Sequence, residues 1–242
     1  MAGDSLTLSH RSRPALAALT LLQLGLLAGF VAAKLLTAPG VAPLKDVPPP
    51  VSAEDIRLLA LGEAGLAAKL LEFWLLTFES QSGRIIKYES LDYDHLSGWL
   101  ETIQQLDPLS NYPSLMASGV FIEVNDDRRA RKMIDFVHRA FLMAPQHRWR
   151  WQARAVILAK YRLDDLELAR RLARDLRIQA ADHDIPGWAR DMEVLILQEM
   201  GEFETARMLV GNLLNSGAVT DPDELRFLTT KLKELSGQPL HK

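Results

Sequence analysis

DDRRAR at residues 126–131, DLELAR at 165–170 and EFETAR at 202–207 share one pattern. Each segment places an acidic residue four positions before an Ala-Arg pair, and the alanines Ala130, Ala169 and Ala206 stand 39 and 37 residues apart. Self-similarity at such a period is typical of an α-solenoid built from helix-turn-helix units. We therefore predict an all-α fold in which these three alanines let paired helices approach closely.

Four prolines recur at intervals of 37, 41 and 36 residues: Pro108, Pro145, Pro186 and Pro222. Proline is tolerated in the first turn of a helix, where the backbone N–H has no helical partner. The spacing predicts that each proline begins a helix, and that polar turns at 124–126, 162–164 and 200–202 join the two helices of each unit. The same signals leave open an irregular helical bundle in which the prolines only end helices.

The alanines, the closing prolines and Gly201 make residues 92–235 resemble tetratricopeptide-repeat (TPR) proteins. The period exceeds 34 residues and the full W-x-x-L-G-x-x-Y pattern is missing, so the resemblance is to TPR-like proteins. The whole chain is similar to membrane-anchored, TPR-like proteobacterial proteins. Four segments carry that similarity: LAAKLLEFWLLTF (66–78), LDYDHLSGWL (91–100), LDPLSNYP (106–113) and TDPDELRFL (220–228). The resemblance implies a layout and no particular activity.

An apolar stretch near the N-terminus reads ALAALTLLQLGLLAGFVAA over residues 15–33 and carries no charge. Extended to residue 36, it matches the thickness of a bilayer at about 1.5 Å per residue. We predict a single-pass transmembrane anchor at 15–36 after a short cytoplasmic tail at 1–14. A cleavable signal peptide and a buried globular helix are the alternatives. The short tail favours a bacterial inner-membrane protein with a periplasmic C-terminal domain.

Residues 37–50 contain five prolines and one glycine, which indicates an extended Pro-rich linker. The helical TPR-like domain is expected at 51–242. Its leucine-rich segment 56–78 carries Glu63, Lys69 and Glu72, which argues against a second span and for a core helix broken near Gly62 or Gly65. A loop with a short, unpaired extended piece is expected around 81–89.

The segment QHRWRW at 146–151 interleaves arginine with tryptophan. Arg148, Trp149, Arg150 and Trp151 are candidate partner-binding residues, because arginine pairs with carboxylates and tryptophan stacks. The alternative is that one tryptophan packs between helices while the arginines reach solvent. On a helix the two tryptophans lie about 200° apart, so they cannot share a face.

Composition excludes several kinds of function. The chain has no cysteine and a net charge of −3, which gives no footprint for nucleic acid. No two of its six histidines stand three or four residues apart, and no phosphate loop or nucleophile elbow occurs. We therefore expect no enzyme activity, no cofactor, no metal and no small-molecule substrate.

The layout of anchor, linker and helical body predicts a membrane-tethered protein–protein interaction or assembly scaffold, in envelope biogenesis or secretion. Two alternatives stay open. One is a periplasmic cell-wall glycosidase-type enzyme on an α-superhelical scaffold, and the other is a structural subunit of a membrane complex. Fold alone does not decide among them.

Overall fold

The computed structural model describes residues 21–29, 32, 46–81 and 84–237, and the chain divides into two units, Met1–Pro43 and Leu44–Lys242. In the first unit residues 21–29 are helical. No helix among the described residues has both the length and the apolar character that crossing a membrane requires. The tail 1–14 and most of the anchor 15–36 lie outside the described residues, so both stay predictions.

The described part of the second unit is helical apart from one small hairpin, which confirms the all-α class. Its α-helices are α2 (Ala53–Leu59), α3 (Ala64–Leu76), α4 (Tyr93–Leu106), α5 (Tyr112–Met116), α6 (Asp127–Met143), α7 (Pro145–Tyr161), α8 (Leu166–Gln179), α9 (Gly187–Arg190), α10 (Met192–Glu199), α11 (Phe203–Asn215) and α12 (Pro222–Ser236). A 3-10 turn lies at Tyr88–Ser90, and a π-helical turn at Ala117–Phe121 continues α5. Strands β1 (Ser80–Gln81) and β2 (Arg84–Ile85) pair antiparallel, where the sequence predicted an unpaired piece.

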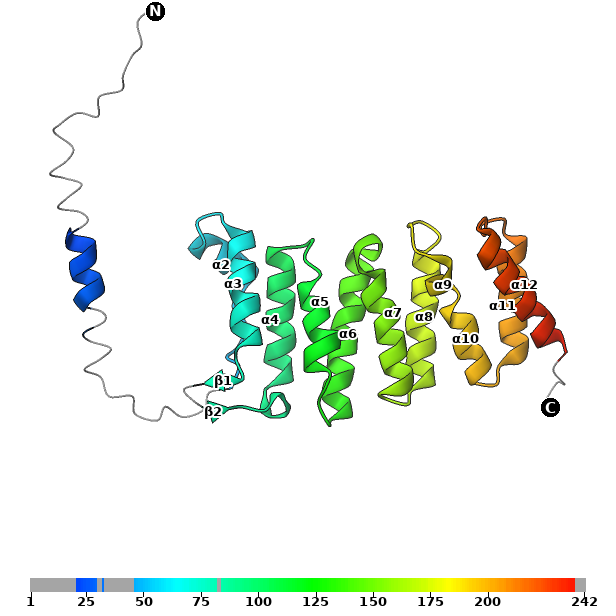
Figure 1. Cartoon of the computed structure of the whole chain (residues 1–242), viewed down its shortest axis with the longest axis horizontal. Helices are drawn as coiled ribbons and strands as arrows, with labels where there is room; N and C mark the ends of the chain where they lie inside the picture. The colour runs from blue at the N-terminus through cyan, green and yellow to red at the C-terminus, as the bar shows by residue number, and fades with distance from the viewer. Residues whose placement is uncertain (1–20, 30–31, 33–45, 82–83, 238–242) are drawn as a thin grey trace, which may run out of the picture. The chain divides into compact units, whose positions relative to one another are not determined.

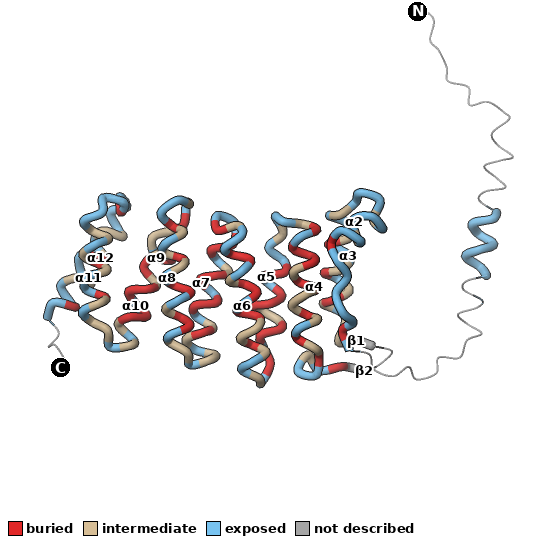
Figure 2. The backbone as a smooth tube through the Cα atoms, turned by 180° about the vertical axis from the view of Figure 1, so that it is seen from behind, coloured by how far each residue is buried: buried red, intermediate tan, exposed pale blue. Residues whose placement is uncertain are grey.

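The helices from α3 to α12 stand side by side in chain order (Figure 1). The main contacts join helices that are close in sequence: α6 with α7, α7 with α8, α8 with α10, and α11 with its neighbours α10 and α12. Burial is densest from α4 to α10 and becomes sparser toward α2 and α12 (Figure 2). The core therefore runs along the row of helices, between each helix and the next.

The polar turns predicted between paired helices are confirmed. Helix α6 begins directly after Asp126, whose carboxylate accepts hydrogen bonds from the backbone N–H groups of Arg128 and Arg129. Helix α8 begins after Asp165, which caps the N–H of Leu168 in the same way. Helix α11 begins after residue 202. These starts follow from local capping chemistry, which a short stretch of sequence contains in full.

The proline prediction holds at three of its four positions. Pro145 and Pro222 begin α7 and α12, and Pro186 is the N-cap residue of α9. The prediction is wrong for Pro108, which lies in the turn between α4 and α5. In that turn the side-chain amide of Gln104 donates to the carbonyls of residues 107 and 110, at 3.3 and 3.1 Å, and helix α5 begins only at residue 112.

The repeated Ala-Arg pair has a structural role in each unit. All three repeat alanines are fully buried, on α6, α8 and α11: Ala130, Ala169 and Ala206. The arginine that follows reaches the acidic residue at the start of the next second helix, Arg131 to Asp165 at 2.7 Å and Arg170 to Glu202 at 2.9 Å. Arg207 instead pairs within α11. The arginine and the acidic residue of the motif thus meet in a contact between α6 and the start of α8, and again between α8 and the start of α11.

Residues 46–51, called the strap here, lie along α4 (Tyr93–Leu106). The sequence assigned residues 46–50 to the linker, yet Val47 is buried and three strap carbonyls bond to α4. The bonds run from His95 Nδ1 to Val47 O at 2.8 Å, from Trp99 Nε1 to Pro48 O at 2.9 Å, and from Thr102 Oγ1 to Val51 O at 3.0 Å. Residues 95, 99 and 102 share one helix face. A proline-rich strand has no internal hydrogen bonds, so its carbonyls are free to accept these donors.

Gly98 permits the strap to lie this close to α4. A Cβ atom at position 98 would come within 2.5 Å of Pro50 Cγ, far inside van der Waals contact. Residues 46–50 therefore belong to the folded unit, and residues 37–45 of the predicted linker lie outside the described residues.

The predicted break in the segment 56–78 is confirmed. Helix α2 ends at residue 59 and α3 begins at residue 64, with positive φ angles at Leu61 (51°) and Gly62 (95°) in between. The segment is not a core helix on all sides, because Leu66, Leu70 and Phe73 of α3 remain exposed. Large apolar side chains remain exposed on α2, α3 and their turn: Leu58, Leu59, Leu61, Leu66, Leu70 and Phe73.

Candidate functional site

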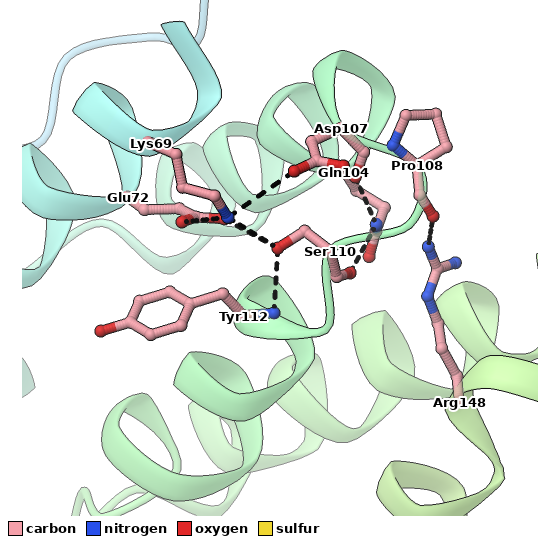
Figure 3. A network of polar contacts seen from close by, with 8 residues as sticks. All are labelled: Lys69, Glu72, Gln104, Asp107, Pro108, Ser110, Tyr112 and Arg148. Carbon is pink, nitrogen blue, oxygen red and sulfur yellow. Dashed lines mark hydrogen bonds and ion pairs between the residues drawn. The ribbon is translucent and has the colours of Figure 1, made fainter. Parts of the chain in front are cut away.

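Arg148, the first of the predicted partner-binding residues, is buried. Its guanidinium donates to the carbonyl of Ala140 at 2.8 Å and to the carbonyl of Pro108 (Figure 3). Both acceptors lie where a helix ends and backbone carbonyls lack a helical partner. Ala140 is in the last turn of α6, and Pro108 is in the turn after α4. Burial lowers the pKa of Arg148, and the carbonyl contacts stabilise its charge. Arg148 therefore holds helices together and is not available to a partner.

The other three predicted residues do not form one exposed surface. Trp149 is buried and packs edge-on against Trp188, with ring centroids 5.5 Å apart. Arg150 lies over the Trp149 ring at 4.9 Å, while Trp151 donates from Nε1 to Asn111 Oδ1 at 3.2 Å. The two tryptophans occupy different faces of α7, as the helical spacing predicted. Partner binding through Arg150 stays a prediction.

A polar network surrounds Arg148 and the turn after α4 (Figure 3). Glu72 of α3 is buried and accepts from Lys69 at 3.1 Å and from Ser110 at 3.0 Å. Lys69 also lies 3.6 Å from a carboxylate oxygen of Asp107. Since these charged groups pair with one another, the network stabilises the junction of α3, α4 and α5. In the same turn Gln104 Oε1 is buried without a hydrogen-bond partner among the described residues.

A groove of about 840 Å³ lies between α7, the α9–α10 segment and the start of α12. We call it the α7–α12 groove. Its walls are mainly apolar and aromatic, and their large side chains include Ile157, Tyr161, Trp188, Leu195 and Phe227. The three walls come from the helical segments that begin at or after Pro145, Pro186 and Pro222. This volume lies in the usual range of sites that enclose a ligand or a short segment.

Four large apolar side chains that line this groove are exposed to solvent. Trp188 is 58% exposed, Tyr161 72%, Ile157 47% and Leu195 41%. Single exposed apolar residues are normal on a protein surface, but several around one hollow mark a binding site. Trp188 also connects this groove to the predicted residues, because its ring contacts Trp149.

A nearly buried ion pair forms part of one wall. Arg190 donates from Nε to Glu224 Oε1 at 3.0 Å, joining α9 to α12. Gly187 makes room for the carboxylate, because a Cβ atom at position 187 would lie 2.0 Å from Glu224 Oε2. The pair fixes the start of α12 against α9 and so sets the width of the groove.

Asp191 lines the same groove in an unusual state. Only 2% of the residue is exposed, and its Oδ1 atom is buried without a hydrogen-bond partner among the described residues. Burial and, to a smaller extent, the negative charge of Glu224 raise the pKa of Asp191 to about 7, while Arg190 acts in the opposite direction. The carboxyl therefore changes its charge near neutral pH.

The other charged groups described along the groove all have partners. Lys160 pairs with Glu199 at 2.8 Å, and Asp223 pairs with Arg226. Asp221 accepts from two backbone N–H groups in the first turn of α12, at 2.8 and 2.9 Å. With Glu224 held by an arginine, Asp191 is left as the charged side chain of the groove that nothing in the described chain satisfies.

Sequence reasoning missed Asp191, Trp188 and the groove itself. In sequence, Asp191 precedes a short apolar run and resembles an ordinary helix-start residue. Its burial beside Glu224 depends on the position of α12, which begins more than 30 residues further along the chain. Trp188 lies two residues after Pro186 and Trp149 lies four residues after Pro145, and this placement near a proline does not distinguish a packed ring from an exposed one.

Within residues 46–81 and 84–237 no group of three or more His, Asp or Glu side chains is placed to hold a metal ion. The chain matches no protein-family model, and neither the curated proteins nor the solved structures contain a match.

Proposed function

We propose that this protein is a membrane-tethered protein–protein interaction or assembly scaffold, and that its TPR-like helical surface binds a segment of a protein partner in the α7–α12 groove. The observation that carries the proposal is the cluster of exposed aromatic and aliphatic side chains around one hollow. Burial of such surface is the main driving force of protein association.

A solenoid interpretation of the helical row supports this proposal. The arginine of one unit contacts the acidic start of the next at Arg131–Asp165 and again at Arg170–Glu202. Repeated contacts of this kind give each unit the same orientation toward its neighbour, so that equivalent helices line one surface. The α7–α12 groove is built from three such equivalent helices.

The proposed setting is the bacterial inner membrane, with the helical domain in the periplasm and the stretch 15–36 as its anchor. An apolar, uncharged stretch of bilayer length supports the anchor. A domain held at the membrane meets its partners at high effective concentration, which suits a scaffold in envelope biogenesis or secretion.

Site-specific photo-crosslinking in native membranes tests the proposal. A benzophenone amino acid at Ile157, inside the groove, is expected to capture one or several protein partners, and the additional change Trp188→Ala is expected to abolish the capture. The matched control is the same amino acid at Ile178 on α8, which is about as exposed but does not line the groove. Equal capture at both positions, or capture that persists without Trp188, would contradict the proposal.

A glycosidase-type enzyme is the second candidate, and Asp191 favours it. A carboxyl with its pKa raised to about 7 beside a second carboxylate is a common arrangement for a general acid. Against it, Glu224 is held by Arg190 and is not free to act as base or nucleophile. Peptidoglycan cleavage by the purified full chain that disappears in Asp191→Asn would establish the enzyme and refute the scaffold.

A further inference from the structure

The acidic side chains of the α7–α12 groove indicate that its ligand carries a positive charge. Four carboxyl groups and one ammonium group line it: Asp191, Asp221, Asp223, Glu224 and Lys160. The ammonium group is neutralised by Glu199, outside the lining. The carboxyl of Asp191, by contrast, is nearly buried and has no partner within the described chain.

We propose that the groove binds an apolar peptide segment of the partner that carries one basic side chain, and that the lysine or arginine of that segment pairs with Asp191. This inference rests on the proposed scaffold function and specifies its ligand. The apolar part of the segment packs against Trp188, Ile157 and Leu195, and the cation reaches the carboxyl between α10 and α12.

A cation fits Asp191 better than a neutral donor does. A carboxylate in apolar surroundings is poorly solvated, so an opposite charge that arrives with a ligand is worth more there than in water. The carboxylate of Glu224 adds negative potential at Asp191, which attracts a cation and repels an anion.

A metal ion fits less well, because it would need several free oxygen ligands. Asp221 already accepts two backbone N–H groups, and Glu224 already accepts from Arg190. One free carboxyl suits a single ammonium or guanidinium group.

The test measures binding of three fluorescein-labelled peptides to the purified full chain by fluorescence anisotropy. Each peptide consists of leucine, tryptophan and glycine around one central residue, which is lysine, norleucine or glutamate. At about pH 8 Asp191 is mostly ionised. The lysine peptide is expected to bind about tenfold more tightly than the norleucine peptide, and the glutamate peptide most weakly.

Two variants locate the effect. Asp191→Asn is expected to remove the preference for lysine, so that the lysine and norleucine peptides bind alike. Asp223→Asn is the matched control on the same groove, and because Asp223 is exposed and already paired with Arg226, the preference is expected to survive. Circular dichroism of both variants verifies the helical fold.

The outcomes distinguish the role of Asp191 from the proposed binding of a partner segment in the groove. If lysine and norleucine peptides bind alike, and Trp188→Ala weakens both, the groove binds apolar segments and the role of Asp191 is refuted. A lysine preference that persists in Asp191→Asn refutes that role as well. If no peptide binds in a Trp188-dependent way, both the groove function and the inference are refuted.

Discussion

Two buried charges show how differently one chain can treat ionisable side chains. Arg148 is enclosed where α4, α6 and α7 meet, and backbone carbonyls at the ends of two helices accept its hydrogen bonds. Asp191 is enclosed as completely, yet its Oδ1 atom has no partner among the described residues. The arginine is thus a structural element, whereas the aspartate lowers the stability of the free protein.

Asp191 is expected to make stability depend on pH. Its pKa is about 7 in the folded protein, against 3.8 for an ordinary aspartate, so the folded state holds the proton more tightly. The free energy of unfolding therefore falls as pH rises from about 4 to about 7 and is flat above. Asp191→Asn should remove this fall and stabilise the protein at about pH 8 by on the order of 2–4 kcal/mol.

Urea unfolding of the full chain at about pH 5 and pH 8 measures the effect. Asp223→Asn, an exposed and paired control, should leave the pH dependence as it is. A wild-type stability that is equal at both pH values would contradict the burial of an ionisable carboxyl at position 191.

Arg148→Met is expected to destabilise the protein by about 2–4 kcal/mol, because it leaves the carbonyls of residues 108 and 140 unsatisfied in a buried place. Arg150→Met is the matched control two residues away. It removes an exposed cation over the Trp149 ring and should change stability by less than about 1 kcal/mol. Urea unfolding compares the two, and equal effects would mean that the burial of Arg148 has no energetic weight.

At the scale of elements, the strap illustrates what sequence reasoning reaches and what it misses. The starts of α6 and α8 were predictable, since Asp126 and Asp165 cap backbone groups two or three residues away. Residues 46–50 were assigned to a linker because their prolines correctly indicate an extended backbone. The prolines do not indicate which side chains donate hydrogen bonds to the carbonyls of that backbone. Its donors, such as Trp99 and Thr102, lie about 50 residues further along the chain.

Gly98→Ala is expected to loosen the strap, because the added Cβ would meet Pro50 Cγ at 2.5 Å. Alanine in a helix is otherwise favourable, so a loss of about 1–3 kcal/mol would report the clash. Gly211→Ala in α11 is the control, where a Cβ atom meets nothing within 4 Å, and a small gain is expected. Proton exchange of the Trp99 indole N–H, which donates to Pro48 O, should be faster in the first variant only, and unchanged exchange of that proton would contradict the close packing.

In the described part of the second unit the core forms three clusters along the row of helices. The largest extends from the strap to α8 and α10, a small one surrounds Phe141 and Trp149, and the third joins α10, α11 and α12. The α7–α12 groove has walls in more than one cluster, and this explains why no local sequence pattern could reveal it. The helix class and the turns follow from short-range patterns, whereas the groove depends on distances among α7, the α9–α10 segment and α12.

The third cluster is expected to unfold before the others. Leu228 of α12 is fully buried in it, and Leu228→Ala should remove about 2–4 kcal/mol, enough to open α11 and α12 locally. Hydrogen exchange should then rise in these two helices and stay unchanged in α4 and α6. Leu100→Ala in the first cluster is the matched control, since Leu100 is equally buried on α4. A uniform rise along the whole chain in Leu228→Ala would indicate a single cooperative unit.

The strap also decides where mechanical force enters the helical domain. A pull on the chain before residue 46 is not delivered to α2, the first helix in sequence, but to α4, through the bonds that His95, Trp99 and Thr102 donate to the strap. A pull along the axis of α4 loads these bonds together in shear, whereas a sideways pull breaks them one after another. Tension applied before residue 46 thus acts first on the largest core cluster, which contains Val47 and the buried side chains of α4.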